Sequence, residues 1–351
     1  MKFKKILFLF PVFLLFSVAC AVPGLSSMMA TDTPVPTNTL PPTLTPQPTA
    51  TTEPTAVPEE ITPPDTQQSN QPAADEVVVV YDNSFRVDEW DYIVGLVQNN
   101  TGGPVEWVEI SVLLYDENDQ VIATENAYPF LDTIPAGDTA PFSIYSDQWA
   151  DASSYDFILN WDAAPEDPPA GLEFVSYTSY SDDYYLNIVG EVRNTSDQPM
   201  GWVKIAAALY ATDGSLLNTN YTYTMLDYIP AGGTSPFKVW FGENWQDADT
   251  YEIQVQGDYE TMPEQTLQIL DDQISEESGY CTVSGHVQNS GSEEVTFATV
   301  VIAFYDADNN ILEAEWSYSD GDSIPAGGTD TFEVTSYNCP VYDHYEVFIG
   351  N

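Results

Sequence analysis

The segment DTIPAGDTAPFSI, at residues 132–144, decides the fold because it occurs three times. Related copies are DYIPAGGTSPFKV at 227–239 and DSIPAGGTDTFEV at 322–334, so each copy begins 95 residues after the one before. In each copy the proline fixes φ within a turn and pushes the preceding residue into an extended conformation. The glycine falls at the fourth turn position, which type I turns favour, and an alternating apolar pattern follows. The segment therefore predicts a corner leading into a β-strand, in three tandem copies of one domain.

Two further segments recur at the same spacing. One reads YIVGLVQNN at 92–100, NIVGEVRNT at 187–195 and TVSGHVQNS at 282–290. Its alternation indicates a half-buried strand. Its glycine indicates a bulge or a close backbone approach. Its asparagines, Asn99, Asn194 and Asn289, indicate polar turns. The other, VEWVEISVLLYDENDQVI at 105–122, carries an apolar stripe and then an acidic hairpin turn.

Five or six short strands in about 95 residues, separated by turn signals, are typical of a small antiparallel sandwich. No helical period is present after residue 75. We therefore predict an all-β protein with three tandem immunoglobulin-like antiparallel β-sandwich domains, at 76–163, 172–258 and 266–351.

These motifs resemble those of the FxLYD domain family. The shared features are the Val-x-Gly-x-Val-x-Asn strand, the strand ends LLYD, ALYA and AFYD, and the Pro-Ala-Gly turn before a Phe-containing strand. Departures are Val112, Ala207 and Ile302 in place of the leading Phe, and Ala211 in place of Asp. The resemblance implies immunoglobulin-like β-sandwiches of bacterial secreted proteins and lipoproteins. It implies no enzymatic activity and no defined ligand, so no functional residues carry over.

The N-terminus has the features of an export signal. Residues 1–20, MKFKKILFLFPVFLLFSVAC, have a basic start, an apolar run and small residues before Cys20. SVAC resembles a lipoprotein cleavage box, although Ser17 stands where such boxes usually carry Leu. We expect Cys20 to be lipidated; the alternative is ordinary cleavage nearby with a free Cys20. The protein would then be exported, anchored by lipid to the bacterial cell envelope and facing outward.

Residues 21–75 are rich in Thr and Pro and contain almost nothing that could build a core. Such a segment is predicted to be a disordered, extended linker that holds the folded part away from the membrane.

The charge restricts the partners. The chain has 7 Lys and Arg against 55 Asp and Glu, a formal net charge of −48. An acidic surface of this kind repels phosphate backbones, which excludes nucleic acid as a partner.

No pattern typical of catalysis is present. The two histidines, His286 and His344, both fall in the third repeat and are interpreted as ordinary surface residues. Gly-rich phosphate loops, zinc-ligand spacings and hydrolase elbows are absent from the sequence. We predict that the protein is not an enzyme, has no catalytic residues and needs no cofactor.

Cys281 and Cys339 lie in the third repeat of what the signal marks as an exported protein. Two cysteines of one domain in an oxidising compartment are expected to pair, and closing the loop between them would stabilise the domain by about 4 kcal/mol. Metal binding by this pair is the alternative, and it has no supporting ligands.

Calcium is an open alternative at two acidic hairpin turns. DENDQ (116–120) and DADNN (306–310) offer alternating oxygen ligands, from Asp116, Asp119, Asp306 and Asp308. Neither turn has the glycine or the closing glutamate of an EF-hand, and the middle copy reads only ATDGS, so acidic turns without metal are favoured over calcium sites.

Aromatic residues recur on the face opposite the core stripe, at Trp107, Trp202 and Phe297, with Tyr115, Tyr210 and Tyr305 on the same side. Such a strip either faces a ligand or is covered by a loop or a neighbouring repeat. The first alternative favours a non-catalytic surface module for binding or adhesion, with an envelope polysaccharide or a surface protein as ligand. The second favours a structural spacer or accessory subunit of an envelope complex.

Overall fold

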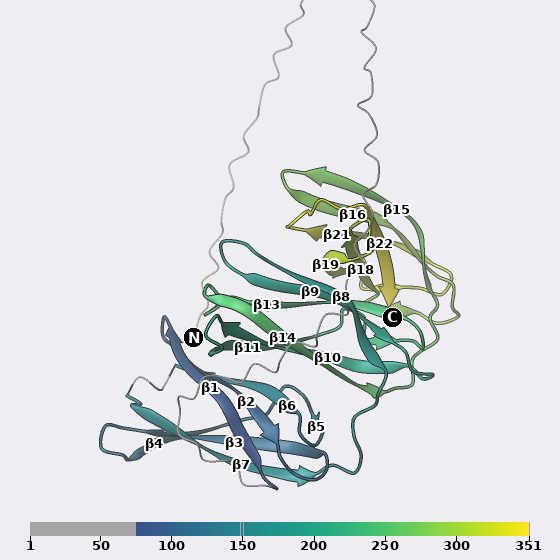
Figure 1. Ribbon diagram of the computed structural model, residues 1–351. Coiled ribbons are helices and arrows are strands. Elements are labelled where there is room, and N and C mark those ends of the chain that lie inside the picture. The colour runs from purple at the N-terminus through teal and green to yellow at the C-terminus, as the bar shows by residue number, and fades with distance from the viewer. Residues whose placement is uncertain (1–74, 148, 150, 351) are drawn as a thin grey trace, which may run out of the picture. The chain divides into compact units, whose positions relative to one another are not determined.

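A computed structural model describes residues 75–147, 149 and 151–350 (Figure 1). The described chain is entirely β-structure, in antiparallel sheets, which confirms the predicted all-β class and tandem sandwiches. Its residues belong to one compact unit. None of them forms a helix that is long and apolar enough to cross a bilayer. The predicted signal peptide, Cys20 and all but the last residue of the 21–75 linker lie outside the described residues.

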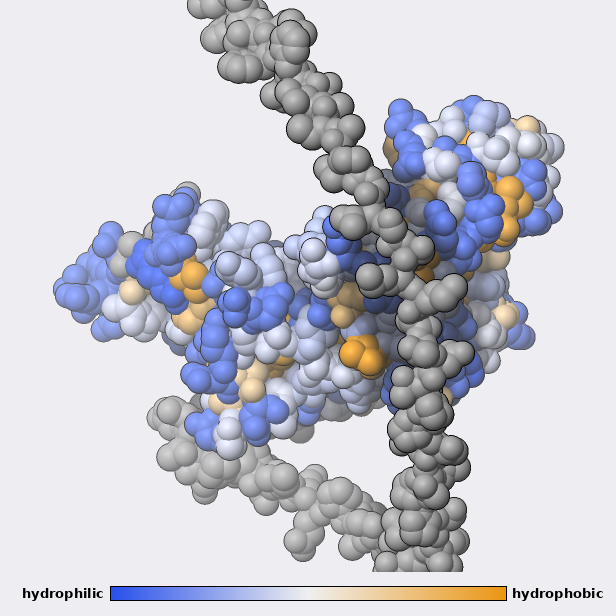
Figure 2. Space-filling model, turned by 90° about the horizontal axis from the view of Figure 1, so that it is seen from above, coloured by the Kyte–Doolittle hydropathy of each residue, from blue (hydrophilic) through white to orange (hydrophobic). Residues whose placement is uncertain are grey.

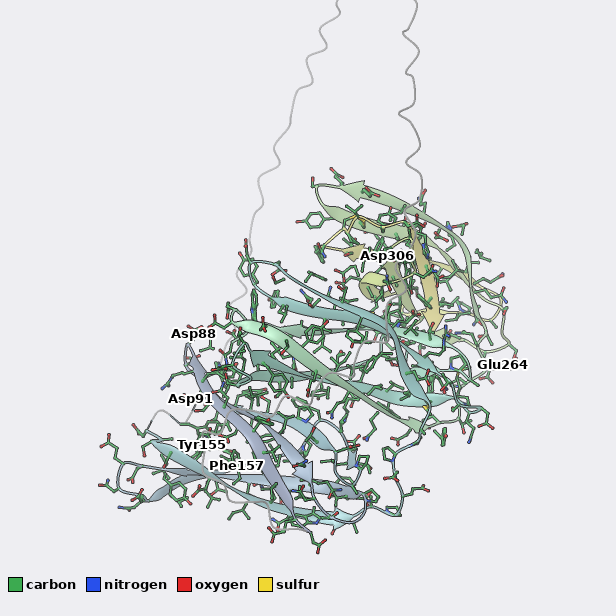
Figure 3. The ribbon with its side chains drawn as sticks, viewed as in Figure 1. Asp88, Asp91, Tyr155, Phe157, Glu264 and Asp306 are labelled. Atoms are coloured by element: carbon green, nitrogen blue, oxygen red, sulfur yellow. A yellow bond between two sulfur atoms is a disulfide. The ribbon has the colours of Figure 1, made fainter. Side chains whose placement is uncertain are left out.

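The first repeat contains two sheets that enclose one core. Its strands are β1 (Val77–Val87), β2 (Trp90–Asn99), β3 (Val105–Tyr115), β4 (Val121–Ala127), β5 (Thr133–Ile134), β6 (Thr139–Ser146) and β7 (Ser154–Ala163). One sheet has the order β1-β2-β6, and the other has β4-β3-β5 with β7 also paired to β3. Figure 3 labels Tyr155 and Phe157 on β7. The Phe157 ring packs edge-on against Phe142 of the other sheet, and the Tyr155 hydroxyl donates to Asp82 on β1 at 2.7 Å. The side chains of β7 therefore join the two sheets.

The other repeats follow the same plan. The second contains β8 (Leu172–Ser181), β9 (Leu186–Asn194), β10 (Met200–Ala211), β11 (Leu216–Tyr223), β12 (Tyr228–Ile229), β13 (Thr234–Phe241) and β14 (Ala248–Tyr259). The third contains β15 (Leu267–Glu277), β16 (Tyr280–Asn289), β17 (Val295–Thr296), β18 (Thr299–Tyr305), β19 (Ile311–Tyr318), β20 (Ser323–Ile324), β21 (Thr329–Ser336) and β22 (His344–Gly350). In the third repeat, β17 and β18 together replace the single strand that is β3 or β10 in the others.

The motif glycine and the motif phenylalanine recur together because they touch. A Cβ added at Gly95 would lie 2.5 Å from the ring of Phe142, which comes from the strand after the Pro-Ala-Gly corner. No side chain fits at that distance, so the predicted close approach at this glycine is confirmed. Gly190 and Gly285 meet Phe237 and Phe332 in the same way.

The motif asparagine is buried and links two of the repeated segments. Asn99 is fully buried, and its Nδ2 donates to the carbonyl oxygens of Gly103 at 2.9 Å and Ile134 at 2.8 Å. Its Oδ1 accepts from the Thr101 amide at 2.9 Å, as expected of an asparagine that opens a turn. Because Ile134 directly precedes the proline of the corner, one side chain fixes both the turn and the corner. Asn194 and Asn289 make the equivalent bonds in their repeats.

Consecutive repeats pack directly on one another, which the alternating pattern did not predict. Val94 and Leu96 on β2, expected on the outward half of a half-buried strand, are 0% and 4% exposed. They form an apolar cluster with Ala208 and Leu216 of the second repeat. A second cluster joins the second and third repeats, from Val189, Ala303, Tyr305, Ile311 and Ala314. We call these contacts the first junction and the second junction.

Candidate binding surface

One large aromatic side chain projects into solvent from the same position of each repeat. Trp107, Trp202 and Phe297 are 71%, 67% and 57% exposed. Their φ angles, 53°, 51° and 55°, lie in the left-handed region, and the strand register slips around Trp107 and Trp202. A bulky residue with such a φ costs about 1 kcal/mol or more. Each repeat therefore keeps a strained backbone that carries an outward-pointing aromatic ring, at a bulge in the first two repeats and between β17 and β18 in the third.

Two of the three tyrosines expected on the same side pack at the junctions. Tyr305 is 4% exposed in the second junction, and Tyr210 packs at the first junction with its ring 6.4 Å from that of Tyr81. Tyr115 is half-buried. The expectation that Tyr305 faces a ligand is therefore corrected, because the packing between repeats buries it; Tyr210 is partly buried against the first junction.

Other tyrosines, which the sequence analysis missed, accompany the exposed rings. The ring of Tyr223 lies 6.4 Å from that of Trp202, and the ring of Tyr318 lies 5.6 Å from that of Phe297. Tyr128 stands at the matching position of the first repeat and is 53% exposed. The 95-residue spacing of these tyrosines was the signal that could have identified them.

A lysine bridges the first junction. Lys204 on β10 places its Nζ 3.1 and 3.2 Å from the two carboxylate oxygens of Asp132 in the first repeat. The same Nζ lies 5.7 Å from the ring centroids of both Tyr221 and Tyr223. This is the geometry of an ammonium held by a carboxylate and by cation–π attraction.

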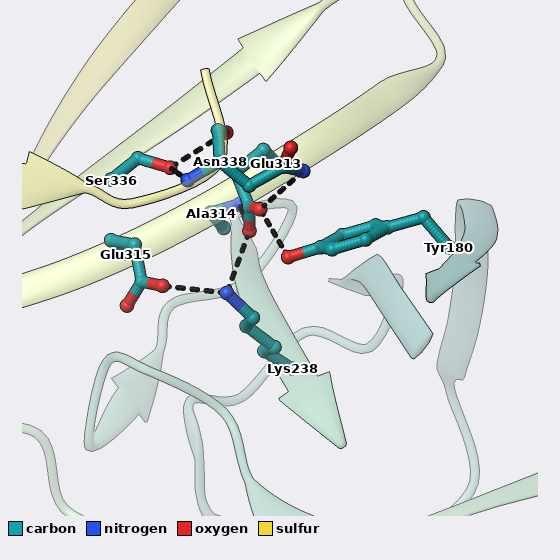
Figure 4. Close-up of polar contacts among 7 residues, drawn as sticks. All are labelled: Tyr180, Lys238, Glu313, Ala314, Glu315, Ser336 and Asn338. Atoms are coloured by element: carbon teal, nitrogen blue, oxygen red, sulfur yellow. Dashed lines mark hydrogen bonds and ion pairs between the residues drawn. The ribbon is translucent and has the colours of Figure 1, made fainter. Parts of the chain in front are cut away.

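A second lysine bridges the second junction (Figure 4). Lys238 Nζ lies 3.0 Å from Oε1 of Glu313 and 2.5 Å from Oε1 of Glu315, both on β19. Glu313 is completely buried, and its Oε2 accepts from the Tyr180 hydroxyl and, at 3.2 Å, from Asn338 Nδ2. Burial opposes the charge of Lys238, but the two carboxylates outweigh it and raise the lysine's pKa. Burial, followed by the Glu313 charge, raises the pKa of Tyr180.

A groove of about 590 Å³ lies at the second junction beside Lys238 and Glu315. Five aromatic side chains line it, from Tyr223, Trp240, Phe297, Trp316 and Tyr318. Asp227, Thr299 and Met225 complete much of its wall. The face drawn in Figure 2 is mostly hydrophilic, with strongly hydrophobic residues confined to small separate patches. This groove differs from those patches because aromatic rings and polar groups line it, rather than mainly aliphatic side chains.

The acidic turns are organised by their own backbone. Asp116 accepts from the amides of Asn118 and Gln120 at 2.8 and 3.0 Å, and Asp306, labelled in Figure 3, accepts from those of Asp308 and Asn310 at 2.9 and 2.8 Å. The Gln120 amide contributes most to lowering the pKa of Asp116, and the Asn310 side chain, whose Nδ2 donates to Asp306 at 2.9 Å, contributes most to lowering that of Asp306. Asp119 takes a left-handed turn conformation, with φ 59°.

Potential metal ligands gather at one place in the described chain. Glu276, Cys281 and Cys339 are the only three such residues whose ligand atoms lie within 4.8 Å of one another. A disulfide joins Cys281 to Cys339, whose Cα atoms are 5.0 Å apart, so neither sulfur is a free thiolate. Calcium at the acidic turns stays a prediction.

Each histidine has a local partner. His286 Nδ1 lies 2.7 Å from Asp271 Oδ1 on the exposed face of β16, and the His344 ring stacks on Tyr305 at 5.2 Å.

Comparison with known proteins identifies no relative that bears on function. No protein-family model matches the chain, and no curated protein matches it. Among solved structures, a red sea bream transglutaminase is 11% identical with a TM-score of 0.18, over 52% of this chain and 29% of that one. A glycoside hydrolase family 2 β-glucuronidase is 12% identical with a TM-score of 0.19, over 76% and 29%. Dimeric latent PorU from Porphyromonas gingivalis is 9% identical with a TM-score of 0.17, over 79% and 32%. The chain thus spans less than a third of each of these proteins.

Proposed function

We propose that this protein is a non-catalytic binding or adhesion module, exported and anchored by lipid to the outside of the bacterial envelope. The exposed ring repeated at Trp107, Trp202 and Phe297 is the observation that supports binding. An exposed large aromatic side chain has an energetic cost in water and here also requires a strained backbone, so its recurrence in three repeats, twice as Trp and once as Phe, favours a role in contacting a ligand.

Repetition strengthens weak contacts. A polysaccharide or a surface protein that presents several copies of one feature can engage more than one repeat of the same chain. Once one repeat is bound, the others bind at a high effective concentration, so weak single contacts become strong attachment. The proposed domains, at 76–163, 172–258 and 266–351, resemble FxLYD domains and would each contribute one such contact.

Replacing the three rings together tests the proposal. The full chain carrying Trp107→Ala, Trp202→Ala and Phe297→Ala is expected to bind immobilised mannan, xylan, β-glucan or whole envelope fractions at least tenfold more weakly than the parent, because it loses the aromatic contacts. Because these side chains are exposed, the melting temperature of the variant should stay within a few degrees of the parent's. Unchanged binding to every surface that the parent retains would refute the role of the rings.

The anchor has a separate test. The mature protein isolated from its native host is expected to begin at Cys20, with a mass increase that matches diacylglycerol and an attached fatty acid. A Cys20→Ser variant should leave the membrane fraction, because the acyl chains would supply the attachment. A mature N-terminus elsewhere, on an unmodified chain, would refute the anchor.

A structural spacer is the second candidate, and the packed junctions favour it. The apolar clusters at both junctions and the two bridging lysines would make the repeats a stiff unit. A spacer requires these junctions but not the exposed rings. The triple ring variant therefore separates the two functions, since a spacer would tolerate it.

A further inference from the structure

We propose that the groove at the second junction binds the ammonium or guanidinium group of a lysine- or arginine-bearing segment of another polypeptide. This inference deepens the proposed binding function and rests on it, since it names the ligand chemistry of one site. It comes from comparing the two junctions of the same chain.

The first junction shows how this fold holds a cation. There the chain's own Lys204 lies between the Asp132 carboxylate and the rings of Tyr221 and Tyr223. Both ring centroids are within the distance of about 6 Å at which an ammonium is attracted to an aromatic face. The first junction is therefore an occupied cation cage.

The second junction has the same cage without the lysine. The 95-residue step carries Asp132, Lys204, Tyr221 and Tyr223 onto Asp227, Thr299, Trp316 and Tyr318. All four second-junction residues line the groove.

Strand pairing supports this correspondence. Lys204 pairs with Tyr223 across β10 and β11, and Thr299 pairs with Tyr318 across β18 and β19. The carboxylate and both aromatic positions are thus conserved within the chain, and only the cation is replaced, by a short neutral side chain. Trp316 in place of Tyr221 makes the vacant cage the better of the two, because tryptophan is the strongest cation–π partner.

The fixed charges of the groove also favour a cation. Lys238 lines the groove, but its ammonium is already shared by Glu313 and Glu315. Of the charged side chains that line the groove, one is positive (Lys238) and two are negative (Asp227 and Glu315). The net charge of −48 on the whole chain would steer basic segments toward it and repel acidic ones. A neutral sugar could stack on the rings, but it would make no use of this charge.

An NMR titration that follows the Trp316 side chain tests whether the groove binds a cation. The probe is the peptide acetyl-Gly-Gly-Lys-Gly-Gly-amide, added to the full chain labelled with ¹⁵N in its tryptophan indoles. The Trp316 resonance is assigned by a Trp316→Phe variant, and cellohexaose and the matching Gln peptide serve as neutral comparisons. We expect the lysine peptide to shift the Trp316 resonance in a saturable, salt-sensitive way, while both neutral probes leave it unmoved.

Variants that exchange residues between the two cages test where the cation binds. Thr299→Lys should fill the cage from within, as Lys204 fills the first, and weaken the peptide at least tenfold; Asp227→Asn should also weaken it. Lys204→Thr should open the first cage and add a peptide-dependent shift of Trp202, whose ring neighbours Tyr223. Because Thr299→Lys and Lys204→Thr each introduce the residue that the equivalent position already holds, folding of both is expected to be preserved.

Three results would overturn the inference. They are no Trp316 shift with the lysine peptide, an equal shift with the Gln peptide, or a shift that survives both Thr299→Lys and Asp227→Asn. A Trp316 shift with cellohexaose alone would assign the groove to sugar, which overturns the cation site and leaves the proposed binding function standing.

Discussion

Replacing Lys238 with alanine is expected to lower the free energy of unfolding by about 3 kcal/mol. The substitution leaves the carboxylate of Glu313, which is 0% exposed, without its counter-charge. Removing one partner of a buried ion pair typically costs 3–5 kcal/mol. We expect the lower end of that range, because the Tyr180 hydroxyl and Asn338 Nδ2 still donate to Glu313.

The pH dependence of this loss has a definite sign. The pKa of Lys238 is raised in the folded protein, so its stabilisation is fully present below the unfolded lysine pKa of about 10.4 and is lost as pH rises through the folded value. The difference between parent and variant should therefore be constant across neutral pH and shrink only in alkali.

Guanidinium unfolding of the full chain from pH 5 to pH 10 measures this effect. Lys204→Ala is the matched control, because its partner Asp132 has a side chain 77% exposed, and it should cost no more than about 1 kcal/mol. Faster amide exchange in β19 should accompany Lys238→Ala, since Glu313 and Glu315 lie on that strand. Equal losses in the two lysine variants would contradict the buried-pair account.

The repeated segments predicted the individual sandwiches well. Period-2 alternation, the Pro-Ala-Gly corner and the acidic hairpins are local signals, and the strands formed where those signals placed them. The motif glycine was expected to mark a close approach, and it lies against Phe142. Each of these features depends on neighbours within one repeat, which is why one repeat's sequence was enough.

The junctions were missed because they depend on two repeats at once. Val94 and Leu96 are apolar on the face that an isolated sandwich would give to water, whereas the third repeat has Ser284 and His286 there. That difference between copies was visible in the sequence and marks which faces are covered. In the sequence, Lys204 and Lys238 are simply two of the few basic residues of an acidic chain. Their pairing with Asp132 and Glu313 needed the structure.

The candidate surface was predicted in part. The sequence identified the positions of Trp107, Trp202 and Phe297. The alternation of side chains along a strand could not decide whether these three rings are exposed or buried. The same alternation also grouped them with Tyr305, which is buried in the second junction, and with Tyr210, which is partly buried at the first. A bulge breaks the alternation of the strand, so side chains beyond it no longer follow the simple pattern.

Replacing Asn194 with alanine is the other substitution with a large expected effect, again about 3 kcal/mol. Asn194 is 0% exposed; its Nδ2 donates to the carbonyls of Gln198 at 2.7 Å and Ile229 at 2.9 Å, and its Oδ1 accepts from the Ser196 amide at 3.0 Å. Alanine leaves two carbonyls and one amide without that partner, at about 1 kcal/mol or more for each group that water cannot reach. The corner at Pro230 also loses its side-chain bond to β9, although the backbone bonds of residue 194 to Gly232 and Gly233 remain.

Urea unfolding of the full chain measures the loss at Asn194. Asn118→Ala is the control: it removes an exposed asparagine from an acidic turn, where its side chain makes a 3.5 Å bond to Asp116, and it should cost less than about 0.5 kcal/mol. Asn99→Ala and Asn289→Ala should each repeat the large effect, because both side chains make the same bonds to their own corners. A large effect in one repeat alone would mean that the shared asparagine is not what joins the strand to the corner. Equivalent losses in all three would explain why the Gly-x-Val-x-Asn strand and the Ile-Pro-Ala-Gly corner always occur together in this chain.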